Sequence, residues 1–253
     1  MQTKEISEKI ERILKLDTHP VALKFYEKKE EMPRRPIVSK MNMCQLISIA
    51  RYQGTANALT PEMHICAIGS ACLGIIKTPE IFSEGKAPVG WYVDNEETGK
   101  KFIGNVFKLG DEGKKYAGIM VEPLGASIPE PDVVVIYANP NQIMRLVHAC
   151  VYDTGEKVAA DTVAEAALCS GAGFAMAKKK PIIEFPCAGD RRFGGTQIHE
   201  LVFAMPYSMA QHIAENLETT GKLGASMYPV APFMFWTPKM AEAYAMKDEY
   251  LEG

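Results

Sequence analysis

The chain has 253 residues, of which 47% are hydrophobic and 23% charged, and this composition is typical of a soluble globular protein with a substantial core. Its formal net charge of −3 gives no electrostatic case for binding nucleic acid or an anionic membrane. No apolar run approaches the roughly 20 residues that span a bilayer. Residues 1–16 alternate charged and apolar positions at helical spacing and lack the apolar stretch of a signal peptide. We therefore expect a cytoplasmic protein with no nucleic acid or membrane partner.

The spacing of apolar residues predicts alternating strands and helices, which indicates an α/β or α+β fold of layered sheet and helices. The aromatic, proline-containing residues 228–246 are expected to pack as a final covering segment. A natural C-terminal cap, Gly54, ends the second predicted helix. In chain order, we predict helices over residues 4–16, 41–54, 94–107, 141–155 and 208–218, and strands over residues 20–26, 117–124, 131–140, 182–185 and 198–206.

Two parts of the chain share an order of features that indicates an internal pseudo-twofold duplication. In each part a strand and an amphipathic helix are followed by a tyrosine, a glycine, a connection and a cysteine that opens a run of tiny residues. The cysteines are Cys66, in "CAIGSACLG", and Cys169, in "CSGAGFAMA". Chance agreement between two ordinary strand–helix units is the alternative.

This interpretation predicts one domain over residues 1–253. Its two pseudo-symmetric halves cover about residues 17–76 and 130–177, and a C-terminal strand and helix segment covers residues 181–253.

The six cysteines are expected to be free, metal-bound or catalytic, because a cytoplasmic compartment is reducing. No CxxC pair occurs, so metal ligands would have to come from distant segments. Cys150 lies on the apolar face of its helix and is expected in the core. Cys72 follows Cys66 by six residues and would face largely away from it on a continuous helix.

The other four cysteines form a candidate set of thiolate ligands. Cys66 and Cys169 stand at equivalent junctions of a loop and a helix, where backbone N–H groups favour a thiolate. Cys44 lies outside the apolar face of its helix, and Cys187 lies in a turn-forming loop. Four thiolates fit an iron–sulfur cluster, which we expect to be of the 4Fe–4S type, or a structural zinc. The missing short-spaced pairs favour the cluster, and buried thiols with no metal are the alternative.

Three other residues are candidates for binding a cofactor or ligand. Arg191 and Arg192, in "CAGDRRFGG", could present guanidinium groups to a carboxylate or phosphate, the alternative being a tight turn in which Asp190 pairs with an arginine. His64 could be a ligand or proton donor beside Cys66, although a lone histidine is more often structural. In "KAPVGWYVD", Trp91 and Tyr92 could wall a ligand pocket or make ordinary core contacts.

The order of these segments resembles the DUF169 family of uncharacterised proteins. The similarity runs from about Pro20 to Pro206, and "AALCSGAGFA" and "PCAGDRRFGGTQIHELVFAMP" are its most specific parts. The resemblance implies anaerobic archaea or bacteria, an environment that tolerates oxygen-labile clusters. It also implies that cysteines matching Cys44, Cys66, Cys169 and Cys187 recur in many family members.

The leading hypothesis is an iron–sulfur protein of anaerobic metabolism that transfers electrons or binds a small substrate at the cluster. Its partner would be a small anionic molecule or a redox protein, and a homo-oligomer is compatible with the sequence. One alternative is a non-enzymatic protein that binds a small carboxylate or cofactor and merely buries its cysteines. Another is an enzyme with Cys187 or Cys66 as nucleophile.

Overall fold

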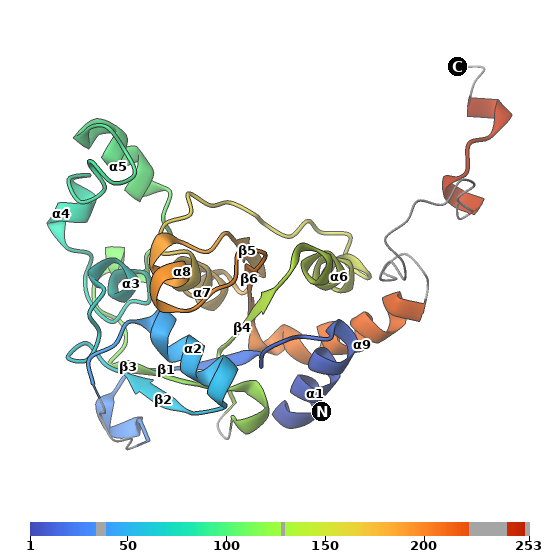
Figure 1. Ribbon diagram of the computed structural model, residues 1–253, viewed down its shortest axis with the longest axis horizontal. Coiled ribbons are helices and arrows are strands. Elements are labelled where there is room, and N and C mark those ends of the chain that lie inside the picture. The colour runs from blue at the N-terminus through green and yellow to red at the C-terminus, as the bar shows by residue number, and fades with distance from the viewer. Residues whose placement is uncertain (34–38, 128–129, 223–241, 251–253) are drawn as a thin grey trace.

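The computed structural model describes residues 1–33, 39–127, 130–222 and 242–250 (Figure 1). The described strands are β1 (Val21–Tyr26), β2 (Asn57–Leu59), β3 (Gly118–Pro123), β4 (Val133–Ala138), β5 (Ile182–Glu184) and β6 (Leu201–Pro206). The described α-helices are α1 (Thr3–Leu14), α2 (Met43–Gln53), α3 (Ala67–Cys72), α4 (Glu80–Ser83), α5 (Glu96–Gly104), α6 (Pro140–Val151), α7 (Ala167–Lys178), α8 (Ala188–Phe193) and α9 (Ala210–Lys222).

The strands form one sheet in the order β2-β3-β1-β4-β6-β5, and every pairing within it is antiparallel. β1 pairs with β3 along its whole length, from Val21 opposite Pro123 to Tyr26 opposite Gly118. β4 pairs with β6 in the same way, and β1 joins the two pairs by its contact with β4. The two halves of the sheet are therefore held together at its centre.

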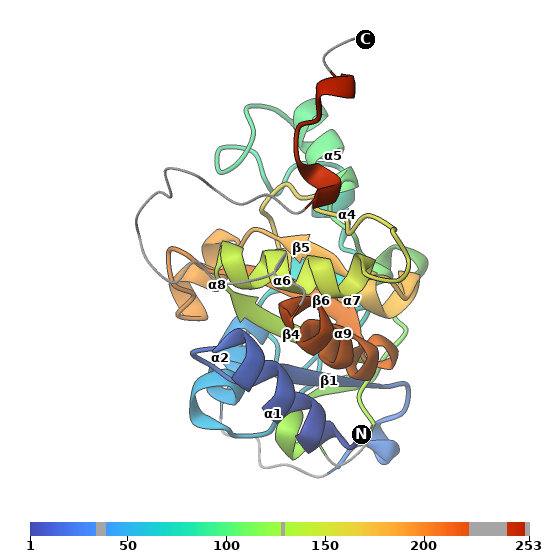
Figure 2. The ribbon, with the colours of Figure 1, turned by 90° about the vertical axis from the view of Figure 1, so that its right-hand side faces the viewer.

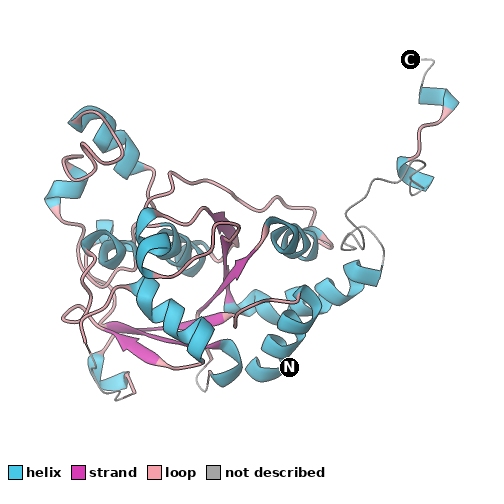
Figure 3. Cartoon of the chain, viewed as in Figure 1, coloured by secondary structure: helices cyan, strands magenta, loops and turns pink. Residues whose placement is uncertain are grey.

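Helices cover both faces of the sheet, as Figures 1 and 3 show. Successive side chains of a strand point to opposite faces, so β4 sends Val133 and Val135 to one core and Val134 and Ile136 to the other. The first core includes residues of α2, α3 and α7, and the second includes residues of α1, α6 and α9. Burial on both faces explains why β4 is continuously apolar rather than alternating.

The helices α2 and α6 begin with the same local device. Asn42 accepts a hydrogen bond from the Gln45 backbone N–H at 2.9 Å, and the Gln45 side chain accepts from the Asn42 N–H at 3.0 Å. Asn139 and Gln142 make the same reciprocal pair before α6. Each capping box satisfies N–H groups that a helix start leaves unpaired. Gly54 closes α2 with a φ of 67°, as predicted.

The small residues of α7 allow close packing on two sides. A Cβ atom at Gly173 would lie 2.4 Å from the carbonyl oxygen of Cys72, and one at Gly171 would lie 3.0 Å from Cγ of Glu184. The first contact joins α7 to α3 and the second joins it to β5. The expectation that small residues let backbones approach closely here is confirmed at Gly173.

The mixed α and β composition predicted from the sequence is confirmed, and the sheet is antiparallel. The interpretation of residues 187–195 as a loop is wrong, because residues 188–193 form α8. The short elements β2 and α4 were not expected from the pattern. Most of the proposed covering segment at residues 228–246 lies outside the described residues.

The two helices compared in the proposed duplication occupy different faces of the sheet. Apolar residues of α2 belong to the first core, whereas those of α6 belong to the second. Figure 2, turned by 90° from Figure 1, shows α1 and α9 together on the α6 side. Since β1 and β4 are antiparallel neighbours, a twofold axis relating them would be perpendicular to the sheet and would leave both helices on one face. The α2 and α6 positions do not follow such an axis.

None of the helices within the described ranges is both long enough and apolar enough to cross a membrane.

Candidate functional site

Four of the six cysteines line one cavity of about 300 Å³ on the α2, α3, α7 and α8 side of the sheet. The cavity wall also includes apolar side chains such as Met43, Ile68 and Leu168, and no lysine or arginine lines it. The four cysteines are Cys44, Cys66, Cys169 and Cys187.

Each of these cysteines lies at the beginning of a helix. Cys44 is in the first turn of α2, immediately after the Asn42 capping box. Cys66 and Cys187 precede α3 and α8 as their N-cap residues, and Cys169 is in the first turn of α7. Four helix starts from distant segments therefore converge on the cavity.

Gly69 provides the space in which two of the thiols come together. A Cβ atom at this position would lie 3.1 Å from Sγ of Cys169 and 3.4 Å from Sγ of Cys66. It would also lie 3.1 Å from Cε1 of His64. A side chain at position 69 would thus occupy the space beside both sulfurs.

Cys44 and Cys187 form a hydrogen-bonded thiol pair. The hydrogen bond from Cys44, together with the backbone N–H groups of Asp190 and Ala167, lowers the pKa of Cys187 to about 7 against the opposing effect of burial. The Asp190 N–H donates to Sγ of Cys187 at 3.4 Å. The same thiol pairing, followed by burial, raises the pKa of Cys44. Of the two thiols, Cys187 therefore has the lower pKa.

Burial raises the pKa of the other two cavity thiols. For Cys66, the backbone N–H groups of Gly69 and Ile68 partly oppose the effect of burial. For Cys169, neighbouring cysteines add to it. Thiolate coordination of a metal at this site would consequently release protons, and its affinity would rise with pH.

His64 lies in the cavity wall, but hydrogen bonds engage both of its ring nitrogens. Nε2 accepts from the backbone N–H of Met43 at 3.0 Å, which leaves Nδ1 to donate to the hydroxyl of Ser70. That hydroxyl donates in turn to the carbonyl oxygen of Cys66 at 2.9 Å. Burial lowers the pKa of His64 to about 4, in agreement with a neutral ring. The ring joins the start of α2 to the Cys66 turn, and neither nitrogen is left to coordinate a metal.

A strained turn carries Glu165 to the edge of the cavity. Ala164 and Ala166 on either side of it have φ values of 55° and 49°, a region that residues with a Cβ rarely adopt. The Tyr92 side chain is hydrogen-bonded to the Glu165 carboxylate. Burial raises the pKa of Glu165, and the bond from Tyr92 opposes that rise.

A buried polar chain extends from Cys187 through the first core. The Tyr137 hydroxyl donates to Oδ1 of Asp190 at 2.7 Å, and the Arg51 guanidinium carbon lies 4.0 Å from the centre of the Tyr137 ring. Arg51 donates to both carboxylate oxygens of Glu200, at 2.6 and 2.7 Å. Burial raises the pKa of Asp190 to about 6. Sequence reasoning did not identify this chain, because its members are dispersed over α2, β4, α8 and the loop before β6.

Of the other predicted residues, Tyr92 lines the cysteine cavity and Trp91 lines the adjoining pocket, whereas the two other cysteines and the two arginines do not line the cysteine cavity. Cys72 and Cys150 are buried in the first and second cores, as expected from their positions. Arg191 donates to the Gln197 carbonyl oxygen, and Arg192 lines an adjoining pocket. Neither arginine makes the turn-forming ion pair with Asp190 that was the alternative interpretation; Asp190 accepts from Tyr137 instead.

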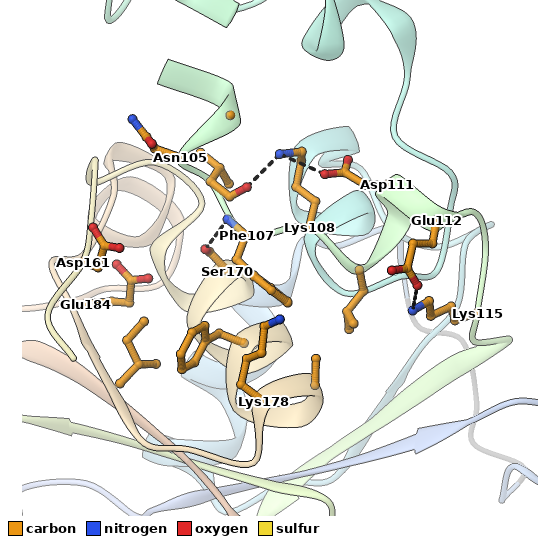
Figure 4. Close-up of a pocket in the computed structure, with 16 residues that line it drawn as sticks. Asn105, Phe107, Lys108, Asp111, Glu112, Lys115, Asp161, Ser170, Lys178 and Glu184 are labelled. Atoms are coloured by element: carbon orange, nitrogen blue, oxygen red, sulfur yellow. Dashed lines mark hydrogen bonds and ion pairs between the residues drawn. The ribbon is translucent and has the colours of Figure 1, made fainter. Parts of the chain in front are cut away.

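A larger cavity of about 390 Å³ lies beside α7 and contains no cysteine (Figure 4). Much of its charge is paired within its own wall, where Lys108 lies 3.4 Å from Asp111 and Lys115 lies 2.6 Å from Glu112. Figure 4 shows the carboxylates of Asp161 and Glu184 close together on another wall. Burial raises the pKa of Glu184 to about 7. No motif in the sequence indicated this cavity.

Within the described residues, no three His, Cys, Asp or Glu side chains are grouped closely enough to hold a single metal ion. A mononuclear zinc site needs its four sulfurs at about 2.3 Å from one point. A 4Fe–4S cluster instead has one iron at each of four corners, so its cysteines are spread farther apart.

Comparison with known proteins gives two matches. The model of the DUF169 family, described as an uncharacterised ArCR, matches residues 9–216. The chain is also 30% identical over 223 residues to the uncharacterized protein MJ0308 of Methanocaldococcus jannaschii, an alignment that covers 86% of this chain and 94% of the relative. No solved structure matches the chain.

Proposed function

The chain belongs to the DUF169 family, and from the geometry of its cysteines we propose that it binds an iron–sulfur cluster of the 4Fe–4S type. The observation that carries the proposal is the convergence of Cys44, Cys66, Cys169 and Cys187 on one cavity. Cys72 and Cys150 are also buried, but they do not line this cavity.

The residues around the cavity suit such a group in two ways. Backbone N–H groups at the starts of α3 and α8 already point to the sulfurs of Cys66 and Cys187, and hydrogen bonds to ligand sulfur tune a cluster. The absence of a side chain at Gly69 leaves room between Cys66 and Cys169. When bound, the cluster would supply one-electron chemistry or, at an iron without a cysteine, Lewis acidity.

Two features support the proposal that a small substrate binds next to the cluster, in addition to electron transfer by the cluster. The cavity shares part of its wall with a second pocket that contains Arg192. Glu165 and Tyr92 stand in that shared wall and are positioned to hold a proton near the cavity. We propose a cytoplasmic setting for this chemistry, where the thiols stay reduced.

The duplication is retained as a proposal in a narrower form. The sheet order reads as β2-β3-β1 and its mirror β4-β6-β5 about the β1–β4 pair. Under this pairing of strands, Cys66, which follows β2, corresponds to Cys187, which follows β5, and not to Cys169, which precedes β5.

A second candidate is a thiol enzyme or redox dithiol that uses Cys44 and Cys187. Their direct hydrogen bond is the specific observation that favours it, since a nucleophilic thiolate needs such a donor. In this case no metal would be present and Cys187 would react rapidly with iodoacetamide in the folded protein.

The test is reconstitution of the purified chain with iron and sulfide in the absence of oxygen, followed by a visible spectrum and iron and sulfide assays. We expect an absorption band near about 400 nm with iron and sulfide in similar amounts. Alanine at Cys44, Cys66, Cys169 or Cys187 should reduce the iron content, whereas the matched variant Cys150→Ala, buried on the other face, should retain it.

Three results would overturn the cluster. The first is a colourless protein after reconstitution, the second is stoichiometric zinc without sulfide, and the third is an equal loss of iron in Cys150→Ala. A colourless protein with one fast-reacting thiol at Cys187 would instead establish the second candidate.

A further inference from the structure

A pocket of about 330 Å³ adjoins the cysteine cavity. Tyr92, Glu165, Gly189 and Phe193 line both, so the two spaces share a wall. The pocket lies between α8 and the segment that carries α4 and α5, which projects from the sheet layers in Figures 1 and 2. Its volume is in the range of small-molecule sites.

Exposed aromatic side chains gather at this pocket. Trp91 is 80% exposed, Phe193 is 51% exposed and Tyr92 is 41% exposed, and all three line it. The Tyr92 ring is stacked on Phe102, with 5.3 Å between ring centres, which holds it in place. Large aromatic side chains left in water around one concavity mark a binding surface, and their faces suit a planar ring.

Arg192 provides the charge of the pocket. Its guanidinium carbon lies 5.8 Å from the centre of the Phe193 ring, and within the described residues it forms no ion pair. The adjacent Arg191 differs, because its Nη1 donates to the Gln197 carbonyl oxygen at 3.2 Å and it does not line the pocket. An unpaired guanidinium beside aromatic walls favours a carboxylate, with which it can form two parallel hydrogen bonds.

Glu165 determines which way such a ligand would lie. Its carboxylate is in the wall shared with the cysteine cavity and is already hydrogen-bonded to Tyr92. A second carboxylate would be repelled at that end of the pocket. The acid group of a ligand is therefore directed to Arg192, and its ring to the aromatic wall.

We propose that this pocket binds a planar aromatic carboxylate, with its carboxylate on Arg192 and its ring against Trp91, Tyr92 and Phe193. Binding depends on the pocket residues alone. Only the further step, that the bound ring lies next to an iron–sulfur cluster, rests on the proposed function.

The test uses benzoate and 2-naphthoate as probes, with saturation-transfer NMR and calorimetry on the full chain in both metal-free and reconstituted form. We expect both acids to bind, and benzamide and cyclohexanecarboxylate, which lack the charge or the flat ring, to bind at least tenfold more weakly. Arg192→Met should weaken binding at least tenfold, because it removes a charge-assisted contact and keeps the side-chain stem. The matched variant Arg191→Met should bind as the original chain does.

Trp91→Ala is a second variant that keeps the test decisive, since the side chain is exposed and its removal leaves the core intact. It should weaken 2-naphthoate more than benzoate. The proposal is overturned if neither acid binds, or if Arg192→Met and Arg191→Met bind equally. If the metal-free chain binds the acids but forms no cluster on reconstitution, the proposed function alone is overturned. If the chain forms a cluster but binds neither acid, the present proposal alone is overturned.

Discussion

Arg51 is a large charged side chain that is buried in the interior of the protein. It is 1% exposed, its guanidinium carbon lies 4.5 and 4.0 Å from the ring centres of Tyr52 and Tyr137, and its charge is balanced by Glu200. In the described part of the chain, its Nε and Nη1 have no hydrogen-bond partner. The buried arginine therefore depends on one carboxylate.

Replacing Glu200 by alanine would leave that charge buried without a partner. We expect Glu200→Ala to lower the free energy of unfolding by about 3–5 kcal/mol, the cost typical of breaking a buried ion pair. Urea denaturation followed by circular dichroism would measure it. The control is Glu156→Ala, whose pair with Lys180 is 71% and 66% exposed and whose loss should cost no more than about 1 kcal/mol. Equal losses of unfolding free energy in the two variants would show that the buried Arg51–Glu200 pair contributes no more to stability than an exposed pair.

The free energy of unfolding should depend on pH through Glu184. Its side chain is 3% exposed, and burial raises its pKa from 4.5 to about 7. Below pH 4.5 the carboxyl is protonated in both the folded and the unfolded chain. Between pH 4.5 and 7 only the folded chain keeps the proton, so stability falls as the pH rises through this window. The loss is of the order of 3 kcal/mol.

Glu184→Gln removes this titration. Compared with the original chain, it should gain stability steadily from pH 4.5 to 7, as measured by urea unfolding at each pH. A stability difference between the two chains that stays constant across this window would contradict the assignment.

At the scale of elements, the α3–α7 contact brings Cys66 and Cys169 together. Gly173→Ala would place a Cβ 2.4 Å from the carbonyl oxygen of Cys72, and backbone cannot yield as a flexible side chain does. We expect a loss of about 1–3 kcal/mol in unfolding free energy, despite the higher helix propensity of alanine. Gly104→Ala, at the end of α5 with nothing within 4 Å, should be neutral or stabilising by about 0.5 kcal/mol. Thermal unfolding compares them, and a neutral Gly173→Ala would show that α3 and α7 can separate freely.

The elements that the sequence predicts well are those that leave a clear mark on the pattern of residues. The helix from Met43 ends at Gly54 because glycine adopts its left-handed cap, and the apolar run of β4 follows from burial on both faces. In contrast, α8 has only six residues and contains Gly189 between Cys187 and two arginines, a composition that also suits a turn. Apolar spacing shows that α2 and α6 each bury one face, but it carries no information on which side of the sheet each lies.

At the scale of the molecule, the cavity exists because the sheet places four distant segments together. The sequence identified Cys44, Cys66, Cys169 and Cys187 as a set, and the structure brings them to one space. The sequence pattern could not identify the Asp190–Tyr137–Arg51 chain. Nor could it show that Arg192 lines a pocket while Arg191 does not. Both depend on side-chain directions that tertiary packing sets. The cavity of about 390 Å³ beside α7 was missed for the same reason.

A bound cluster would join these four segments, and its binding free energy would add to the stability of the fold. We expect the reconstituted chain to unfold at a higher temperature than the metal-free chain. Hydrogen exchange should slow at the starts of α2, α3, α7 and α8, while α1, α6 and α9 on the opposite face should change little. Slowing spread evenly over both faces, or none at all, would contradict a cluster at this cavity.

The edges of the sheet have a consequence for self-association. The outer strands β2 and β5 have three residues each, so each edge offers few backbone groups to a neighbouring strand. Pairing of a second copy at either edge would therefore involve only a short stretch of backbone hydrogen bonds. Short outer strands are one of the means by which sheet proteins oppose strand-by-strand polymerisation.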